Sequence, residues 1–259
     1  MFQLSICADT VFLDVPFSER VQRINSLGFS VEFWGWRDRD LTALFDNPDI
    51  QVNGMSGVRQ GSLVDPDGLE AYLTDLLETA SVANKLKCQN LILVTGELGP
   101  NGEVIHTQAD HPITRWITAY KGLCQIAEIA EKHNLTYCVE HLNLKVDHAG
   151  YSLPYVEDAV RLVEEVGSPR IKILLDLYHA QVEEGNIIQL IRDFHDYVGY
   201  IHVADVPGRH EPGTGEMNYP LIVQTLHTLG YNGPIGLEAF PATDSQQAII
   251  AESMQCLNN

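Results

Sequence analysis

The sequence predicts an α/β protein folded as a (β/α)8 barrel, with one domain over residues 1–259. Short β-rich runs alternate with helical patterns from one end of the chain to the other. The length of 259 residues fits a barrel of this kind, which uses roughly 250 residues as one unit. Acidic or histidine side chains also stand at the ends of four consecutive runs, where a closed parallel barrel would gather them.

Eight apolar runs of four or five residues predict the strands of the barrel. In chain order they are Leu4–Cys7, Ser30–Phe33, Gln51–Met55, Asn90–Val94, Thr136–Glu140, Lys172–Asp176, Tyr200–Ala204 and Pro234–Glu238. The connections between them are long enough for a helix, so we expect parallel strands joined by right-handed crossovers. Eight such units close most naturally into a barrel.

The helices are predicted between the strands by apolar stripes that follow prolines. The clearest stripe, after Pro66, consists of Leu69, Leu73, Leu76, Leu77, Ala80 and Ala83. The stripe after Pro112 consists of Trp116, Ile117, Tyr120, Leu123, Ile126, Ala127 and Ala130. Two further stripes follow Pro154 and Pro220, and they end at Gly167 and Gly230, the usual position of glycine beyond a helix.

An open doubly wound sheet is the alternative fold. Such a sheet often carries a Gly-x-Gly-x-x-Gly turn after its first strand, and the sequence has none there. The nearest match, Gly213–Gly215, follows the seventh predicted strand and is more typical of a plain loop. The segment Gly96–Gly102 predicts a small hairpin or flap over the barrel top, with Asn101 and Gly102 at its tip.

The composition limits the partners of the chain. It has 45% hydrophobic and 20% charged residues, and it lacks an apolar stretch of about 18 residues that would cross a membrane. The formal net charge of −19 disfavours nucleic acid, whose phosphates an acidic surface repels. Without a basic n-region or apolar core at the N-terminus, we expect a cytoplasmic protein. The expected partner is a small-molecule substrate, with no nucleic acid and no membrane, and the sequence leaves open a homo-oligomer.

The five cysteines indicate a reduced protein without a disulfide framework. Their number is odd, they are widely scattered, and no Cys-x-x-Cys pair is present. Cys7 and Cys138 fall inside predicted strands, where free cysteine usually packs as a small apolar residue. A packing role is therefore favoured over catalysis.

The four side chains at the run ends are Glu140, Asp176, His202 and Glu238. Each alone has an ordinary explanation, because a carboxylate at a strand end often caps the next helix and a lone histidine is usually a satisfied core residue. On four consecutive strands of a barrel, however, they would form one ring. Three carboxylates and one imidazole suit one divalent cation such as Mn²⁺ or Mg²⁺, whereas zinc more often recruits extra histidine or cysteine.

A cation in this ring predicts proton-transfer chemistry on a hydroxy-ketone. By chelating two neighbouring oxygens, it would stabilise the ene-diolate that forms when the intervening carbon loses a proton. Glu140 and Glu238 would be the catalytic acid and base on opposite sides of the barrel. His179, just past the sixth strand, and Arg209, on the loop after the seventh, are predicted to bind substrate oxygens or a carboxylate.

The C-terminal half, from Glu140 onward, resembles the hydroxypyruvate isomerase family, and the N-terminal half resembles it only loosely. The motifs are Asp176–Gln181, Val203–Tyr219 and Gly236–Glu238. The resemblance implies a xylose isomerase-like TIM barrel, a fold shared with ketose 3-epimerases and apurinic-site endonucleases. It also implies conversion of hydroxypyruvate to tartronate semialdehyde (2-hydroxy-3-oxopropanoate) via a cis-enediolate. Glu140 and Glu238 would then be acid, base and metal ligands, Asp176 a metal ligand, and His179 and Arg209 substrate contacts.

Two departures from the family pattern affect the expected substrate. Hydroxypyruvate isomerases usually have glutamine where this chain has His202, and ketose 3-epimerases have histidine there. In the N-terminal half, Phe33–Trp36 and Met55–Gln60 replace the expected pocket residues. Arg59 is a candidate to bind a substrate carboxylate. Trp34 and Trp36 are candidates to line the pocket, although packing explains such aromatic residues equally well.

Three alternatives to this isomerase remain open. A ketose 3-epimerase or an aldose–ketose isomerase of a free sugar would use the same cation and carboxylates. An endonuclease of the same superfamily would need several metals, yet the third and fourth predicted strands end without histidine and the net charge has the wrong sign. A non-catalytic sugar-binding barrel would be expected to have lost at least one of the four ring residues.

Overall fold

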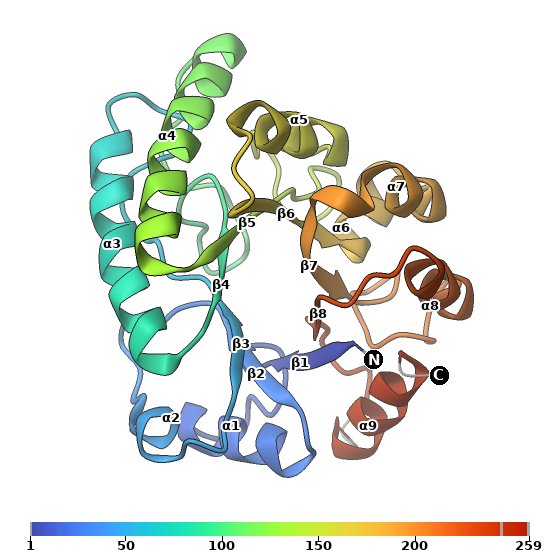
Figure 1. The fold of residues 1–259 in the computed structure, drawn as a ribbon. Helices are drawn as coiled ribbons and strands as arrows, with labels where there is room; N and C mark the ends of the chain where they lie inside the picture. Colours follow the sequence, from blue (N-terminus) through green and yellow to red (C-terminus); the bar gives the residue numbers. More distant parts are fainter. Residues whose placement is uncertain (1, 244–245, 258–259) are drawn as a thin grey trace.

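In the part of the chain that the structure describes, eight strands form one closed parallel barrel, in which each strand pairs with its neighbours in sequence and β1 pairs with β8 (Figure 1). The computed structural model describes residues 2–243 and 246–257. The strands are β1 (Gln3–Cys7), β2 (Ser30–Phe33), β3 (Val52–Met55), β4 (Asn90–Leu93), β5 (Thr136–Glu140), β6 (Ile171–Asp176), β7 (Val198–Val203) and β8 (Pro234–Leu237). The predicted barrel is confirmed, with strand bounds shifted by at most two residues, and the doubly wound alternative is wrong.

The helices surround the barrel, as Figure 1 shows. They are α1 (Phe17–Ser26), α2 (Thr42–Asp46), α3 (Leu69–Leu86), α4 (Pro112–His133), α5 (Val156–Val166), α6 (Leu177–Glu183), α7 (Ile187–Phe194), the 3-10 turn η1 (His195–Tyr197), α8 (Tyr219–Thr228) and α9 (Gln246–Cys256). Proline stands in the first turn of α4 and of α8, and Gly167 ends α5 in the left-handed conformation. These signals are therefore confirmed, whereas Pro66 and Pro154 stand before the first turns of α3 and α5.

The predicted apolar stripes are wider than the helix faces that pack on the barrel. On α3, Leu76, Ala80 and Ala83 are buried, but Leu77 is 44% exposed. On α4, Ile117 and Tyr120 are also exposed. Successive residues of a helix are about 100° apart, so a stripe that includes neighbours in sequence extends beyond the contact with the sheet.

The strand register brings the four predicted ring positions to one end of the barrel. Asp176 at the end of β6 pairs with His202 of β7, and His202 in turn pairs with Gly236 of β8. Glu140 ends β5, and the backbone N–H of Glu238, one residue after β8, donates to the carbonyl of Val203 at 3.2 Å. The carboxyl ends of β5 to β8 therefore carry the candidate site, which is the usual place for a site in this fold.

The turn-rich segment after β4 forms the predicted hairpin. Leu98 and Val104 form an antiparallel bridge, and the backbone N–H of Gly99 donates to the carbonyl of Glu103 at 2.7 Å. At the tip, the carbonyl of Gly102 is hydrogen-bonded to Nδ1 of His148, 2.7 Å away in the loop after β5. The hairpin is thus hydrogen-bonded to the loop that follows β5, the strand that ends at Glu140.

All five cysteines are free, as expected. Cys7, Cys88 and Cys138 are buried, and burial raises the pKa of the Cys88 and Cys138 thiols to about 12. These thiols stay protonated at neutral pH and are therefore poor nucleophiles.

Within residues 2–243 and 246–257, no helix combines the length and apolar character that a membrane crossing requires. The cytoplasmic location and the number of subunits stay predictions.

Candidate metal centre

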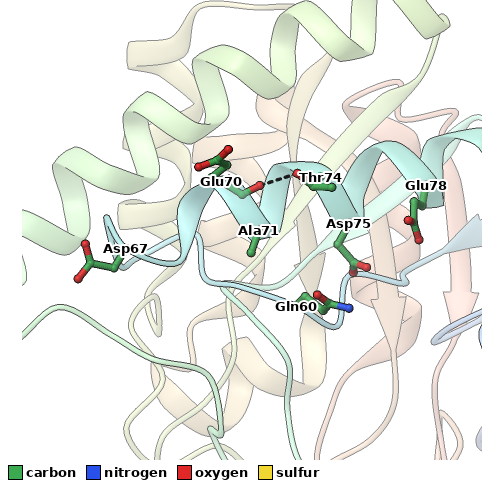
Figure 2. Close-up of a pocket in the computed structure, with 7 residues that line it drawn as sticks. All are labelled: Gln60, Asp67, Glu70, Ala71, Thr74, Asp75 and Glu78. Atoms are coloured by element: carbon green, nitrogen blue, oxygen red, sulfur yellow. Dashed lines mark hydrogen bonds between the residues drawn. The ribbon is translucent and has the colours of Figure 1, made fainter.

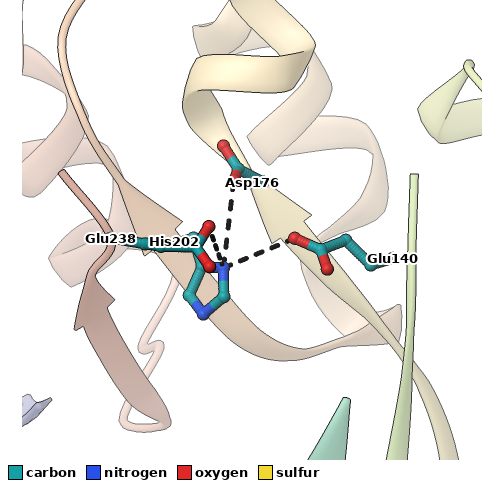
Figure 3. A group of neighbouring side chains, drawn as sticks. All are labelled: Glu140, Asp176, His202 and Glu238. Carbon is teal, nitrogen blue, oxygen red and sulfur yellow. Dashed lines mark ion pairs between the residues drawn. The ribbon is translucent and has the colours of Figure 1, made fainter. Parts of the chain in front are cut away.

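The four predicted ring residues meet in one buried cluster. Each offers one ligand atom, and these four atoms lie within 4.8 Å of one another. Figure 3 shows the three carboxylates around the imidazole of His202, and all four residues are buried. The cluster consists of Glu140, Asp176, His202 and Glu238, and it is called the metal centre below.

The donor geometry fits a divalent cation. Nδ1 of His202 lies 3.4 Å from Glu140 Oε1, 3.8 Å from Asp176 Oδ2 and 3.3 Å from Glu238 Oε2, yet it makes no hydrogen bond. A buried nitrogen without a partner, facing three carboxylates, is costly unless something between them satisfies all four groups. One cation would do so, and three oxygens with one imidazole nitrogen suit Mn²⁺ or Mg²⁺.

The two glutamates of the metal centre differ in proton affinity. Burial raises the pKa of Glu140 to about 7, although His202 opposes the rise. Burial alone would raise the pKa of Glu238. His202 and Arg209 outweigh burial and hold the pKa of Glu238 well below its usual range. Pairs of carboxyl groups separated in this way are typical of acid and base partners in catalysis.

The imidazole of His202 favours its charged form in the metal-free protein. Burial alone would lower its pKa, but the carboxylates of Glu238 and Glu32 outweigh burial and hold the pKa well above its ordinary value. Asp176 has a raised pKa because of burial, which the guanidinium of Arg209 opposes. The metal-free centre therefore retains protons that a cation must displace.

We expect the affinity of the metal-free protein for Mn²⁺ to increase as pH rises through neutrality. Glu140 and His202, whose pKa values are raised, bind a cation only after losing their protons. At low pH, protons therefore compete with the cation for these two side chains. At high pH this competition disappears. Calorimetric titrations at about pH 6 and about pH 8, in buffers with different ionisation enthalpies, count the released protons. Equal affinity at both pH values with no proton release would contradict this expectation.

Arg209 reaches the carboxylates of the metal centre, and its predicted contact with substrate stays a prediction. Its Nη2 lies 3.3 Å from Oδ2 of Asp176 and forms a close ion pair with Oε2 of Glu238. The guanidinium also stacks over the ring of Tyr178, with 5.1 Å between its central carbon and the ring centroid. The side chain of Arg209 is 13% exposed, and its charge partly offsets that of the carboxylates.

His179 is buried beside the metal centre with its hydrogen on Nε2. Asn143 holds it there, because the Asn143 Oδ1 accepts from the backbone N–H groups of Val146 and Asp147, at 3.0 and 3.1 Å. The Nδ2 of Asn143 must then donate to Nδ1 of His179, at 2.6 Å. Nε2 is left as a donor without a hydrogen-bond partner, 3.6 Å from Oδ2 of Asp176. Burial lowers the pKa of His179, so the ring is neutral.

The two tryptophans after β2 have different environments. The indole Nε1 of Trp34 donates a short hydrogen bond to Oε1 of Glu238, and the ring is 42% exposed. Trp36 instead donates to Oγ1 of Thr79 on α3, at 3.1 Å, and stacks with Arg37. Trp34 therefore contacts the site, whereas Trp36 packs against a helix.

Arg59, the predicted anchor for a substrate carboxylate, pairs with a different group. Its Nη1 lies 2.9 Å from Oδ2 of Asp38, and its side chain is partly exposed. Its backbone N–H donates to Asp75 at 2.6 Å. No hydrogen bond or ion pair joins it to the metal centre among the described residues, and its role in substrate binding stays a prediction.

Sequence reasoning missed Asn143 and Glu32, which both contact site histidines. Asn143 follows Glu140 by three residues, at the start of the loop after β5. Glu32 lies within the apolar strand β2, where a carboxylate is a signal of a buried polar partner. Only the fold shows which partners these residues have.

A separate groove of about 340 Å³ runs along the first turns of α3 (Figure 2). It is lined by Gln60, Asp67, Glu70, Ala71, Thr74, Asp75 and Glu78, and it shares no residue with the metal centre. Its one buried carboxylate, Asp75, is paired with Arg37 at 2.5 Å. The groove therefore offers no unpaired buried group for a ligand.

Comparisons with known proteins agree with the barrel fold. A family model described as xylose isomerase-like TIM barrel matches residues 21–259. A 2-oxo-tetronate isomerase from Pectobacterium atrosepticum is 29% identical over 92% of this chain and 92% of its own length. A hydroxypyruvate isomerase from Escherichia coli is 32% identical over 51% of each chain.

Among solved structures, an AP endonuclease of family 2 from Brucella melitensis superimposes with a TM-score of 0.87. It is 26% identical, and the match covers 98% of this chain and 99% of that one. The shared barrel therefore extends over the whole length of both proteins.

Proposed function

Since this chain belongs to the xylose isomerase-like TIM-barrel family and is an isomerase, we propose that it interconverts a small hydroxy-keto acid and its aldehyde isomer. The first candidate reaction is hydroxypyruvate to tartronate semialdehyde, and 2-oxo-tetronate is the next candidate substrate. The observation that carries the proposal is the metal centre, a cluster that could hold a divalent cation and that includes two glutamates. The relatives named isomerases of 2-oxo acids support the choice of substrate class.

The chemistry requires one carbon-bound proton to move between neighbouring carbons. When bound, a divalent cation would supply Lewis-acid stabilisation of the negative charge that develops on the two substrate oxygens. For hydroxypyruvate, a proton leaves C3, a proton is returned to C2, and the hydroxyl proton of C3 passes to the oxygen on C2. The isomerisation is therefore balanced without an oxidant or a reductant.

The residues of the site supply the proton transfers and the orientation. Glu238, which His202 and Arg209 hold ionised, accepts the proton that leaves the substrate carbon. Glu140 returns a proton to the neighbouring carbon. Nε2–H of His179 donates to a substrate oxygen, and Arg209 faces the anionic end of the substrate. Burial of Glu140, His179 and Glu238 limits the access of water to the reacting atoms.

A ketose 3-epimerase is the second candidate, and His202 favours it, because that position carries histidine in ketose 3-epimerases. The same residues would return the proton to the opposite face of the carbon from which it came. An endonuclease is disfavoured by the net charge of −19 and by strand ends β3 and β4 without histidine. Within the described residues, a single group of three or more metal-binding side chains is present.

A panel of substrates tests the proposal. Hydroxypyruvate, tartronate semialdehyde, 2-oxo-tetronate and four- to six-carbon ketoses are incubated with the Mn²⁺ or Mg²⁺ protein in D₂O, and NMR locates the deuterium. Conversion of a hydroxy-keto acid with deuterium at C2 of the aldehyde product supports the isomerase. Deuterium at C3 of a ketose with inversion there supports the epimerase instead, and cleavage of abasic DNA would contradict both.

We expect Asn143→Asp to lower kcat/KM by about 10²-fold, although the two side chains have nearly the same shape. An aspartate side chain presents only acceptors, so it no longer donates to Nδ1 of His179 and favours a hydrogen on Nδ1 over one on Nε2 alone. Steady-state kinetics on protein of unchanged secondary structure measures the effect. Val146→Ala, on the same loop but exposed, is the control and retains near-native kinetics. Native turnover in Asn143→Asp would show that the donor on Nε2 is not used.

A further inference from the structure

A buried polar network lies inside the barrel next to the metal centre. Glu32 of β2 accepts two hydrogen bonds on Oε2, from Oγ of Ser5 at 3.0 Å and from the hydroxyl of Tyr200 at 2.5 Å. The hydroxyls of Ser5 and Tyr200 are also 2.7 Å apart. All three side chains are buried, and Tyr200 precedes His202 by two residues on β7. The network therefore lies one layer deeper in the barrel than the metal centre.

The second oxygen of the Glu32 carboxylate faces the metal centre. Oε1 of Glu32 lies 3.2 Å from Nε2 of His202. Both atoms are buried, and neither makes a hydrogen bond in the described chain, so they face each other at ion-pair distance with no hydrogen-bond partner. The opposite ring nitrogen, Nδ1, faces Glu140, Asp176 and Glu238. His202 thus lies between one carboxylate on its deep side and three on the other.

Two glycines provide the space for this arrangement. A Cβ at Gly236 of β8 would overlap with the carboxylate of Glu32, and a Cβ at Gly54 of β3 would lie 3.1 Å from the ring of Tyr200. Neither glycine has a positive φ, so neither is required by the backbone conformation. Glycine inside a strand loses packing, and here the space it leaves is filled by the polar network. The barrel interior is therefore shaped around Glu32.

We propose that Glu32 is a positioning residue for the metal centre, which keeps the hydrogen of His202 on Nε2 and directs the lone pair of Nδ1 toward the cation. This inference rests on the proposed cation-dependent function. Histidine ligands of metals commonly donate their other ring N–H to a carboxylate, and loss of that partner weakens metal binding by about 10- to 100-fold. Ser5 and Tyr200 fix the rotamer of Glu32 through its other oxygen.

Metal affinity separates this role from a merely structural one. We expect Glu32→Ala to raise the Kd for Mn²⁺, measured calorimetrically on metal-free protein, by about 10- to 100-fold. Glu32→Gln keeps an acceptor for Nε2–H and is expected to restore part of the affinity. Asp75→Asn is the matched control, because Asp75 is an equally buried carboxylate that pairs with Arg37 outside the metal centre. The control is expected to lower thermal stability without changing the Kd.

The wild-type protein provides a second measurement, in which a variant serves only to assign the signal. In the Mg²⁺-loaded protein, ¹⁵N NMR of the imidazoles reports which nitrogen of His202 carries the hydrogen, and the signal is assigned by its loss in His202→Gln. A hydrogen on Nε2 is expected, and a hydrogen on Nδ1 would overturn the inference.

The failures of this inference and of the proposed function are distinguishable. If the wild-type protein binds Mn²⁺ and folded Glu32→Ala binds it equally well, Glu32 has no positioning role while the metal centre stands. If the wild-type protein binds neither Mn²⁺ nor Mg²⁺, the cation-dependent function fails and the inference fails with it.

Discussion

Glu140→Gln and Glu238→Gln are each expected to lower kcat by about 10²- to 10⁴-fold while the fold is retained. An amide has the shape of the carboxylate and keeps an oxygen for a cation, but it cannot accept or return a proton at neutral pH. Metal content should fall only partly, because three of the four ligand atoms of the metal centre remain in each variant. The loss should therefore appear in turnover more than in metal binding.

Steady-state kinetics and metal analysis on the same preparations test this expectation. A mixing experiment in D₂O adds detail, since a variant that still removes the substrate proton but cannot return it exchanges deuterium without forming product. Asp75→Asn again serves as the control, as a buried carboxylate outside the metal centre. Near-native kcat in either glutamate variant would contradict the two-carboxylate mechanism.

Removal of divalent cations is expected to abolish turnover, and re-addition of Mn²⁺ or Mg²⁺ is expected to restore it. Without the cation, nothing balances the charge that develops on the substrate oxygens, and a loss of several kcal/mol of stabilisation corresponds to about 10³-fold or more in rate. The metal-free centre also retains protons on Glu140 and His202, whose pKa values are raised, so neither presents its ligand atom freely.

Dialysis against a chelator, elemental analysis and a cation titration test this second expectation. Thermal unfolding provides a readout independent of substrate, because a cation that binds only the folded protein stabilises it by about 2.7 kcal/mol at 100 times its Kd. A rise in Tm with Mn²⁺ in the wild-type protein, reduced in Asp176→Asn, would place the cation at the metal centre. Full turnover in protein shown to contain no metal would exclude the proposed role of a cation.

The strands and the helices α3, α4, α5 and α8 could be predicted because local patterns specify them. Eight apolar runs, each followed by a segment long enough for a helix, leave few topologies that obey the right-handed crossover rule. The helix after Asp65-Pro66 was predicted correctly in position, yet Leu77 is exposed. Periodicity shows that a helix is amphipathic, but the width of its buried face depends on the neighbours that pack on it.

The metal centre could be predicted because a closed parallel barrel has only one face where strand ends converge. Glu140, Asp176, His202 and Glu238 each end or nearly end a run, so strand order alone brings them together. Arg59 could not be placed in the same way. It lies on a loop after β3, and loop side chains pair with whichever charge is nearest in space, here Asp38.

The sequence by itself determined the fold class, the four residues of the metal centre and the class of chemistry, because each follows from periodicity and from the position of polar residues at strand ends. Only the tertiary structure decided which nitrogen of His202 faces the carboxylates, how Asn143 directs His179, and that Glu32 reaches His202 from β2. The contact of Asn143 with His179 joins residues 36 positions apart, and that of Glu32 with His202 joins residues 170 positions apart. No local pattern in a sequence encodes the direction of a side chain toward a partner so far along the chain, because that direction is set by the register and curvature of the closed barrel.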